Sequence, residues 1–285
     1  MRGKLIVDTV LRQLIGRSCL ITEPVEMNIL VCIKQVPDSF ETLQINERTG
    51  LVGLPLNTAF RMNRFDEFAL EEALLMKERL SGALVHALSV GPERVSDTVQ
   101  RALGMGADHG IHILDSSEGY ISPLIVASVI AAFARTRRYD IILTGAMAED
   151  TMACQTGQLV AALLDLPCAT SVMKEEIDLD REQIVVEREI EGGSRERMQI
   201  KMPAVLTVQP GINHPRYPSF SKVMRARSYA QERIRAQNLT PEEPRESSLG
   251  MQIPEPASQG VFIEGSPREK ALELITILHE KSLLS

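Results

Sequence analysis

The sequence contains no tryptophan, and aromatic residues make up only 4% of its 285 residues. Proteins that bind single-stranded nucleic acids stack bases on aromatic side chains, and few such platforms are available here. A basic excess is lacking as well, because 38 acidic residues outnumber 31 lysines and arginines and give a net charge of -7. Without surplus positive charge to neutralise phosphates, the composition argues against a nucleic-acid-binding protein.

Cysteine is scarce, and its spacing excludes the common metal motifs. Cys19, Cys32, Cys154 and Cys168 form no C-x-x-C pair, and no histidine cluster accompanies them. The sequence therefore predicts a reduced, cytoplasmic protein without a metal site. Taken alone, Cys32 in a strand and Cys154 in a helix are expected to be small core residues. No apolar stretch approaches the ~18–20 residues of a membrane span, so no span is expected.

Three motifs that would announce catalysis or phosphate binding are also absent. The sequence has no G-x-x-x-x-G-K-[ST], no G-x-G-x-x-G after a strand, and no Ser/His/Asp arrangement at a nucleophile elbow. The glycine-rich stretch GMGADHG (104–110) follows a helical pattern, which disfavours a phosphate cradle there. No catalytic residue is therefore expected.

What the sequence does contain is a regular alternation of strand-like and helix-like blocks. The strand-like runs are near-continuously apolar, as expected of strands buried on both faces. Such alternation predicts an α/β fold, a doubly wound parallel sheet with helices on both faces. The strand-like runs are NILVCIKQV (28–36), ALVHALSVG (83–91), GIHIL (110–114) and YDIILTG (139–145), and the helix-like blocks include RFDEFALEEALLMKERL (64–80) and PLIVASVIAAFARTR (123–137).

The pattern changes towards the C-terminus. After about residue 170 the sequence reads as alternating strands with Gly192 and Gly193 at a hairpin turn, which predicts an antiparallel extension of one sheet edge. From Arg227 it turns rich in Pro, Glu and Ser, typical of an extended arm. A final helix then starts with Ser266 at the N-cap and Pro267 at the first position. Its apolar stripe either docks on another subunit or packs back on its own domain.

These patterns divide the chain into three parts. Residues 1–26 are expected to be a disordered N-terminal extension, 27–226 an α/β nucleotide-binding domain, and 227–285 a C-terminal arm and helix. Ligands of open parallel sheets bind outside the carboxyl ends of the strands. The loop after YDIILTG is therefore a candidate site, since the helix that follows it offers free N–H groups to a phosphate. Asp150 and Thr151 could cap that helix instead, and the residues alone leave both readings open.

Eight stretches, in this order and spacing, resemble the beta subunit of the electron-transferring flavoprotein, and the resemblance covers roughly nine-tenths of the chain. Each stretch alone is a weak signal, whereas eight in register are specific. They are VCIKQVPD (31–38), MNRFDEFALEEAL (62–74), ALSVGP (87–92), RALGMGADHGIHI (101–113), TGAMAEDTMACQTGQ (144–158), VEREIEGG (186–193), MPAVLTV (202–208) and INHPRYPSFSKVMRA (212–226).

The resemblance implies a heterodimer whose alpha subunit holds a redox-active FAD. The pair would carry electrons from acyl-CoA-type dehydrogenases to a quinone reductase or another acceptor, without bond-making chemistry in this subunit. It also implies an adenine-nucleotide-hydrolase-like fold with AMP bound structurally in the beta subunit. The alternative is a bifurcating type, in which a second FAD takes the place of AMP and accepts electrons from NADH.

The resemblance also implies site residues. Phe220 falls where the family has an aliphatic anchor for partner dehydrogenases, with Met224 and Arg225 beside it, and the C-terminal arm and helix would embrace the alpha subunit. The bifurcating pattern D-G-D-T-A-Q is replaced here by D-T-M-A-C-Q (150–155), which favours AMP over FAD. The implied nucleotide contacts are Cys32, Asn63, Arg64, Phe65, Asp66, Val90, Gly145, Ala146, Met147, Ala148, Glu149, Asp150, Thr151, Met152, Ala153, Cys154, Gln155 and Thr156.

Overall fold

The computed structural model describes residues 27–38, 44–46, 50–55, 57–117, 120–239, 242–243, 245–247, 249–252, 260 and 262–284. The predicted extension, residues 1–26, lies outside the described residues. Within the described ranges, every helix is too short or too polar to cross a membrane.

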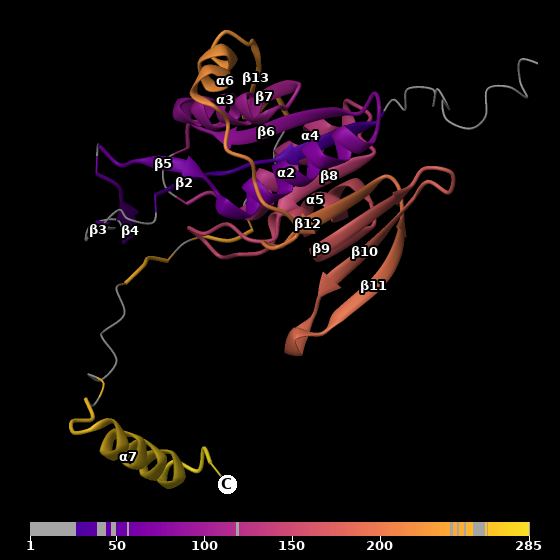
Figure 1. The fold of residues 1–285 in the computed structure, drawn as a ribbon. Coiled ribbons are helices and arrows are strands. Elements are labelled where there is room, and N and C mark those ends of the chain that lie inside the picture. The colour runs from indigo at the N-terminus through magenta and orange to yellow at the C-terminus, as the bar shows by residue number, and fades with distance from the viewer. Residues whose placement is uncertain are drawn as a thin grey trace, which may run out of the picture.

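The described residues form one large sheet in the strand order β11-β10-β9-β12-β8-β1-β6-β7-β13 (Figure 1). Neighbours from β9 through β13 in that order run parallel, whereas β10 is antiparallel to both β9 and β11. The predicted parallel sheet and its antiparallel edge are therefore confirmed. The strands are β1 (Asn28–Cys32), β6 (Leu84–Gly91), β7 (His109–Leu114), β8 (Ile141–Gly145), β9 (Cys168–Asp178), β10 (Gln183–Glu189), β11 (Arg195–Lys201), β12 (Ala204–Val208) and β13 (Gln231–Arg235).

Smaller elements surround this sheet. Two short antiparallel pairs join β2 (Gln35–Pro37) to β5 (Phe60–Met62) and β3 (Gln44–Asn46) to β4 (Leu51–Gly53). The α-helices are α2 (Arg64–Arg79), α3 (Ser96–Met105), α4 (Pro123–Arg135), α5 (Thr156–Leu164), α6 (Phe220–Ala226) and α7 (Pro267–Glu280), and short 3₁₀ turns cover Glu93–Val95, Glu191–Gly193 and Ala236–Leu239.

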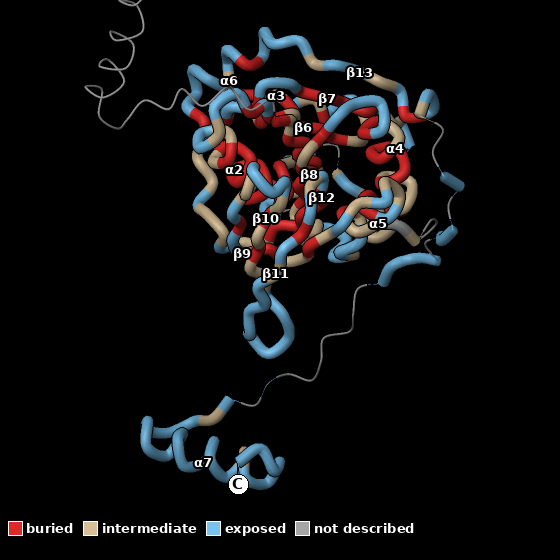
Figure 2. Tube along the Cα trace, turned by 90° about the vertical axis from the view of Figure 1, so that its right-hand side faces the viewer, coloured by how far each residue is buried: buried red, intermediate tan, exposed pale blue. Residues whose placement is uncertain are grey.

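The central strand β1 shows why its sequence is continuously apolar. Ile29 and Val31 point into the core beneath α2 and α3, while Leu30 and Cys32 point into the core beneath α4 and α5. Successive side chains of a strand point to opposite faces, so a strand covered by helices on both sides needs apolar residues at every position. Figure 2 shows the resulting buried centre enclosed by helices.

After residue 226, strand β13 joins the sheet, whereas helix α7 does not pack on it. β13 pairs in parallel with β7, so the sheet takes one strand from the segment that the sequence assigns to the arm. α7 begins as expected, with Ser266 as its N-cap in a capping box with Glu269 and Pro267 at the first position. It buries none of its residues and lies apart from the sheet (Figures 1 and 2).

Candidate site at the carboxyl edge of the sheet

Three central strands end side by side, and the residues expected at a ligand site follow them. β1 lies between β6 and β8, with Cys32 in register with Leu88 on one side and Thr144 on the other. Cys32 is buried at the end of β1, Val90 is half-buried near the end of β6, and Gly145 is the last residue of β8. The parallel sheet therefore brings these three predicted positions to one edge.

Residues at the start of α2 hold the loop after β8 in place. The Asn63 side chain donates to the Met147 carbonyl at 2.9 Å and accepts from the Glu149 N–H at 3.1 Å. The buried Asp66 carboxylate accepts the Gly145 N–H at 2.9 Å and the Lys34 N–H at 2.7 Å. The first turn of α2 is thus joined to two of the three strand ends.

Space is also tight where α2 meets β8. A Cβ atom on Gly145 would lie 2.4 Å from Asp66 Oδ1 and 2.6 Å from the Cβ atom of Phe65, so only glycine fits at this position. Phe65 is half-buried, whereas the Arg64 side chain is exposed and only its backbone N–H reaches the loop, donating to Glu149 at 3.1 Å. Of the predicted α2 residues, Asn63, Phe65 and Asp66 therefore shape the loop most directly.

Two cations that the sequence alone did not predict at the site pair with its acids. Arg61 pairs with Glu149 at 3.0 Å, and Lys34 pairs with Asp150 at 2.7 Å. Lys34 lies inside the predicted strand-like run 28–36, beyond the end of β1, and Arg61 directly precedes the predicted stretch 62–74. That proximity was the available signal, but pairing across 88 and 116 residues depends on the tertiary fold. With both acids paired, the loop presents little net negative charge.

The loop holds two non-glycine residues in the left-handed backbone region. Met152 has φ 51° and Cys154 has φ 52°, and the Met152 N–H closes a turn on the Ala148 carbonyl at 2.8 Å. Such conformations cost about 1–3 kcal/mol each and persist where surrounding contacts impose them. The expectation that Cys154 is a core residue in a helix is wrong, because it is exposed and precedes the helix.

The helix that follows, α5, starts without a side-chain cap. Its N-cap residue is Gln155, so neither Asp150 nor Thr151 caps it, and the Gln155 side chain makes no capping bond either. The first N–H groups of a helix lack intrahelical partners and carry the positive end of its dipole. Gly157 lets this turn approach the sheet closely, since a Cβ there would lie 2.6 Å from Thr144 Oγ1 and 2.6 Å from Thr207 Cγ2.

Burial shifts the pKa of two groups at this edge. Desolvation raises the pKa of Asp66 to about 7, although the hydrogen bonds from Lys34, Asn63 and Gly145 oppose the shift. Desolvation, reinforced by the nearby Asp66 charge, also raises the pKa of the Cys32 thiol. Cys32 is therefore a neutral, unreactive thiol at neutral pH.

The remaining loop residues serve through their backbone or face outwards. The Ala146 N–H donates to the Val208 carbonyl at 2.9 Å, which ties the loop to β12 as well. Ala153 and Thr156 are half-buried, while Thr151 and Met152 are exposed, Met152 to 66%. Within the described ranges, no three metal-ligating side chains cluster.

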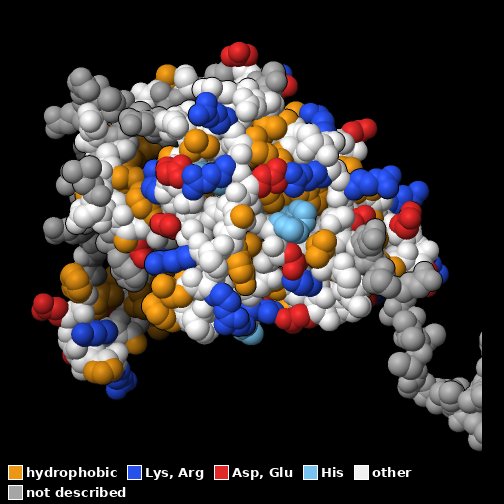
Figure 3. Space-filling view, turned by 90° about the horizontal axis from the view of Figure 1, so that it is seen from above, with side chains coloured by type: hydrophobic (Ala, Val, Ile, Leu, Met, Phe, Trp, Pro, Cys, Tyr) orange, Lys and Arg blue, Asp and Glu red, His pale blue; other side chains and the backbone are white. Residues whose placement is uncertain are grey.

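The predicted docking residues lie on α6, away from this loop. Phe220 is 80% exposed and Met224 is 43% exposed, and Arg225 is exposed beside them. α6 packs on α3 so closely that a Cβ on Gly104 would lie 3.3 Å from the Cα of Val223. Figure 3 shows this side of the molecule, where Lys and Arg side chains stand beside Asp and Glu side chains with apolar ones between them.

The helices on both faces of a mostly parallel sheet define the doubly wound α/β class. Residues 56–239 match the family model described as an electron transfer flavoprotein domain. A relative from Arabidopsis thaliana, the mitochondrial electron transfer flavoprotein subunit beta, is 38% identical over 214 residues, covering 75% of this chain and 83% of that protein. The subunits beta of Sus scrofa and Homo sapiens are each 37% identical over 217 residues, with the same coverage.

The chain therefore belongs to the electron transfer flavoprotein family, as a beta subunit. This confirms the resemblance drawn from the eight stretches. Membership implies a role in electron transfer within a flavoprotein, and an alpha subunit as partner.

Proposed function

We propose that this chain pairs with an alpha subunit that holds FAD, and that the heterodimer carries electrons from acyl-CoA-type dehydrogenases to a quinone reductase or another acceptor. In this proposal the beta subunit is a carrier subunit without catalytic residues, and it binds AMP as a structural nucleotide. The observation that carries the AMP site is the uncapped start of α5 beneath a loop that α2 clamps in place.

The residues present fit the phosphate of an adenosine monophosphate. The free N–H groups at the start of α5 suit a phosphate, and the Gln155 and Thr156 side chains can add hydrogen bonds to it. Lys34 and Arg61 remove the repulsion that Asp150 and Glu149 would otherwise exert on an anion. AMP itself supplies no redox chemistry; it would fill the edge and stiffen the loop.

The nucleotide is tested by its identity. Heterodimer co-expressed with its alpha subunit is heated, and the released nucleotides are separated by chromatography and counted per heterodimer. We expect one AMP and one FAD. Two FAD molecules and no AMP would overturn the AMP assignment and favour the bifurcating type, in which the second FAD accepts electrons from NADH. A colourless chain that ignores every alpha subunit would overturn the heterodimer.

Docking is proposed to use the exposed apolar residues of α6 for the dehydrogenase and the apolar side chains of α7 for the alpha subunit. Leu272, Leu274 and Ile275 of α7 are 57%, 48% and 46% exposed. Apolar side chains gathered on one exposed helix indicate an interaction surface. Phe220→Ala should raise the KM of an acyl-CoA dehydrogenase for the heterodimer about tenfold, as loss of a buried aromatic anchor does. An unchanged KM would contradict the anchor role.

The compartment also remains a proposal. The sequence predicts a cytoplasmic protein, and the name of the Arabidopsis thaliana relative places that protein in mitochondria. Fractionation of the source cells with antibodies against the chain distinguishes the two locations, and recovery in the mitochondrial fraction would contradict the cytoplasmic prediction.

A further inference from the structure

The segment that leads to the docking helix has no regular secondary structure. β12 ends at Val208 and α6 begins at Phe220, and residues 209–219 between them belong to neither a helix nor a strand. Phe220 is the first residue of α6, so its direction depends both on the packing of α6 on α3 and on where this segment runs. The Gln209 N–H donates to the Val172 carbonyl of β9 at 3.0 Å at the start of the segment, whereas side chains hold its middle on α2.

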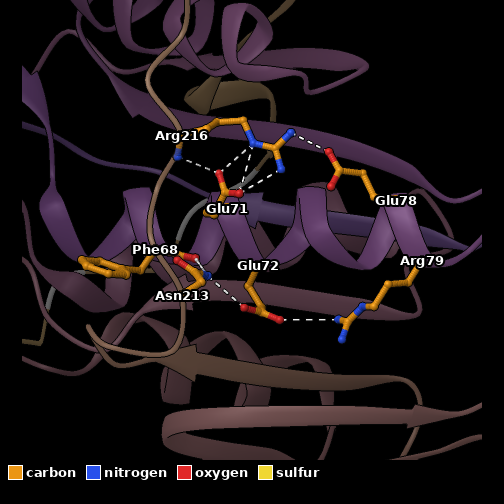
Figure 4. A network of polar contacts seen from close by, with 7 residues as sticks. All are labelled: Phe68, Glu71, Glu72, Glu78, Arg79, Asn213 and Arg216. Carbon is orange, nitrogen blue, oxygen red and sulfur yellow. Dashed lines mark hydrogen bonds and ion pairs between the residues drawn. The ribbon is translucent and has the colours of Figure 1, made fainter.

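Arg216 fixes the middle of the segment on α2 (Figure 4). Its backbone N–H donates to Glu71 Oε2 at 2.9 Å, and its guanidinium donates to the same carboxylate through Nε at 2.9 Å and Nη2 at 2.8 Å. Nη1 donates to Glu78 at 2.6 Å. The Glu71 side chain is only 5% exposed and the Arg216 side chain is 32% exposed, so this bidentate pair buries its carboxylate while the guanidinium keeps some contact with water.

Asn213 fixes the segment at a second point on α2. Its amide donates to the Phe68 carbonyl at 3.0 Å and to Glu72 Oε2 at 2.8 Å. Glu72 in turn pairs with Arg79 (Figure 4). Arg79 also pairs with the buried Glu175 of β9. Neighbouring residues of one helix, Glu71 and Glu72, therefore hold the segment from two sides.

These contacts fix the position of the segment relative to α2. α2 is packed in the core and cannot shift, since Leu70, Ala73 and Met76 are fully buried. Breaking a buried carboxylate pair leaves an uncompensated charge, so the segment has one favoured position on the helix. The Arg216 fork demands a planar carboxylate partner, a geometry that lysine cannot reproduce.

We infer that Glu71 and Glu72 of α2, through Arg216 and Asn213, are positioning residues that orient Phe220 for docking on the electron-donating dehydrogenase. The inference rests on the proposed docking function of α6 and places the residues that position Phe220 on α2. Neither residue of α2 needs to contact the dehydrogenase, because each acts through the segment it holds.

The test uses the heterodimer with Arg216→Lys, Glu71→Gln and their double variant. Arg233→Lys is the matched control, because Arg233 of β13 forms an exposed ion pair with Glu93. Two quantities are measured: amide hydrogen exchange of peptides covering residues 212–226, and the KM and kcat of an acyl-CoA-type dehydrogenase with the heterodimer as electron acceptor. Flavin content and the thermal midpoint report on folding.

We expect faster exchange in 212–226 and a KM raised about tenfold with kcat changed less than twofold, since a bidentate pair is reduced to a single contact. The double variant should be no worse than either single variant, because both remove the same pair. Unchanged hydrogen exchange in 212–226 overturns the inference. Faster exchange with an unchanged KM also overturns it, provided that Phe220→Ala raises the KM. If Phe220→Ala itself leaves KM unchanged, the docking function fails and the positioning role with it.

Discussion

Replacing Gly145 by alanine probes the junction on which the candidate nucleotide site is built. The added Cβ would lie 2.4 Å from Asp66 Oδ1, 2.6 Å from the Phe65 Cβ and 2.8 Å from the Phe65 carbonyl carbon. Two of these atoms belong to the first turn of a packed helix and cannot rotate away. Either the end of β8 or the start of α2 must therefore move, and the Gly145 N–H bond to Asp66 at 2.9 Å is strained or lost.

The expected size of the effect follows from these contacts. Overpacking of a well-packed site costs about 1–3 kcal/mol, and a lost hydrogen bond to a carboxylate adds about 1.5–3 kcal/mol. We therefore expect Gly145→Ala to destabilise the protein by about 3 kcal/mol. For a chain of this size the thermal midpoint should fall by roughly 6–12 °C. AMP should also bind less tightly, because the loop begins at this residue.

The assay compares the thermal midpoint and the bound AMP per heterodimer in the wild type, Gly145→Ala and the control Gly260→Ala. Gly260 is a matched control, since its backbone needs no left-handed conformation and, among the described residues, its added Cβ would meet no atom within 4 Å. The control should behave as the wild type. A Gly145→Ala protein within about 2 °C of the wild type and with full AMP would refute the reasoning, given that 1 kcal/mol moves the midpoint by ~2–4 °C.

Three further predictions concern Asp66, Asn63 and the final helix α7. The pKa of Asp66 is raised to about 7, so the folded chain holds a proton that the unfolded chain releases, and stability is lost as pH rises from about 4 to 7. Asp66→Asn should make the thermal midpoint less dependent on pH in that window, as calorimetry can measure; an unchanged slope contradicts this. Asn63→Ala removes two loop contacts and should weaken AMP binding about tenfold in equilibrium dialysis. Leu274→Ser should weaken assembly with the alpha subunit, measured by calorimetric titration, whereas Lys270→Ser should not.

The elements that were predictable from sequence are those whose signals are local. The apolar runs of β1, β6 and β8 need only burial on both faces, and the start of α7 needs only Ser266 and Pro267. β13 escaped because its sequence, QERIR, carries charges at three of five positions. As an edge strand it packs only Ile234 against a core and leaves its charges in water, a pattern that resembles a polar arm.

For the candidate site as well, the position was predictable from sequence and the contacts that hold it were not. Its position at the carboxyl edge follows from the parallel topology, which sequence periodicity indicates. Its fastening does not, because Asn63 contacts a loop 84 and 86 residues away and Asp66 reaches Gly145 across 79 residues. Cys154 was misplaced for a related reason: the apolar run that follows it is helical, but the left-handed turn at Cys154 delays the helix to Thr156.

The acids of the loop would seem to argue against a phosphate ligand, yet their pairing reverses that inference. An unpaired Glu149 and Asp150 near the start of α5 would compete with an anion for the positive end of the helix. Instead Arg61 and Lys34 draw both carboxylates away, and the Glu149 carboxylate also accepts the Arg64 N–H at 3.1 Å. The two carboxylates thus join the loop to Lys34 beyond β1, to Arg61 of β5 and to the start of α2. The first N–H groups of α5 therefore have no side-chain cap, and the phosphate of AMP is proposed to bind to them.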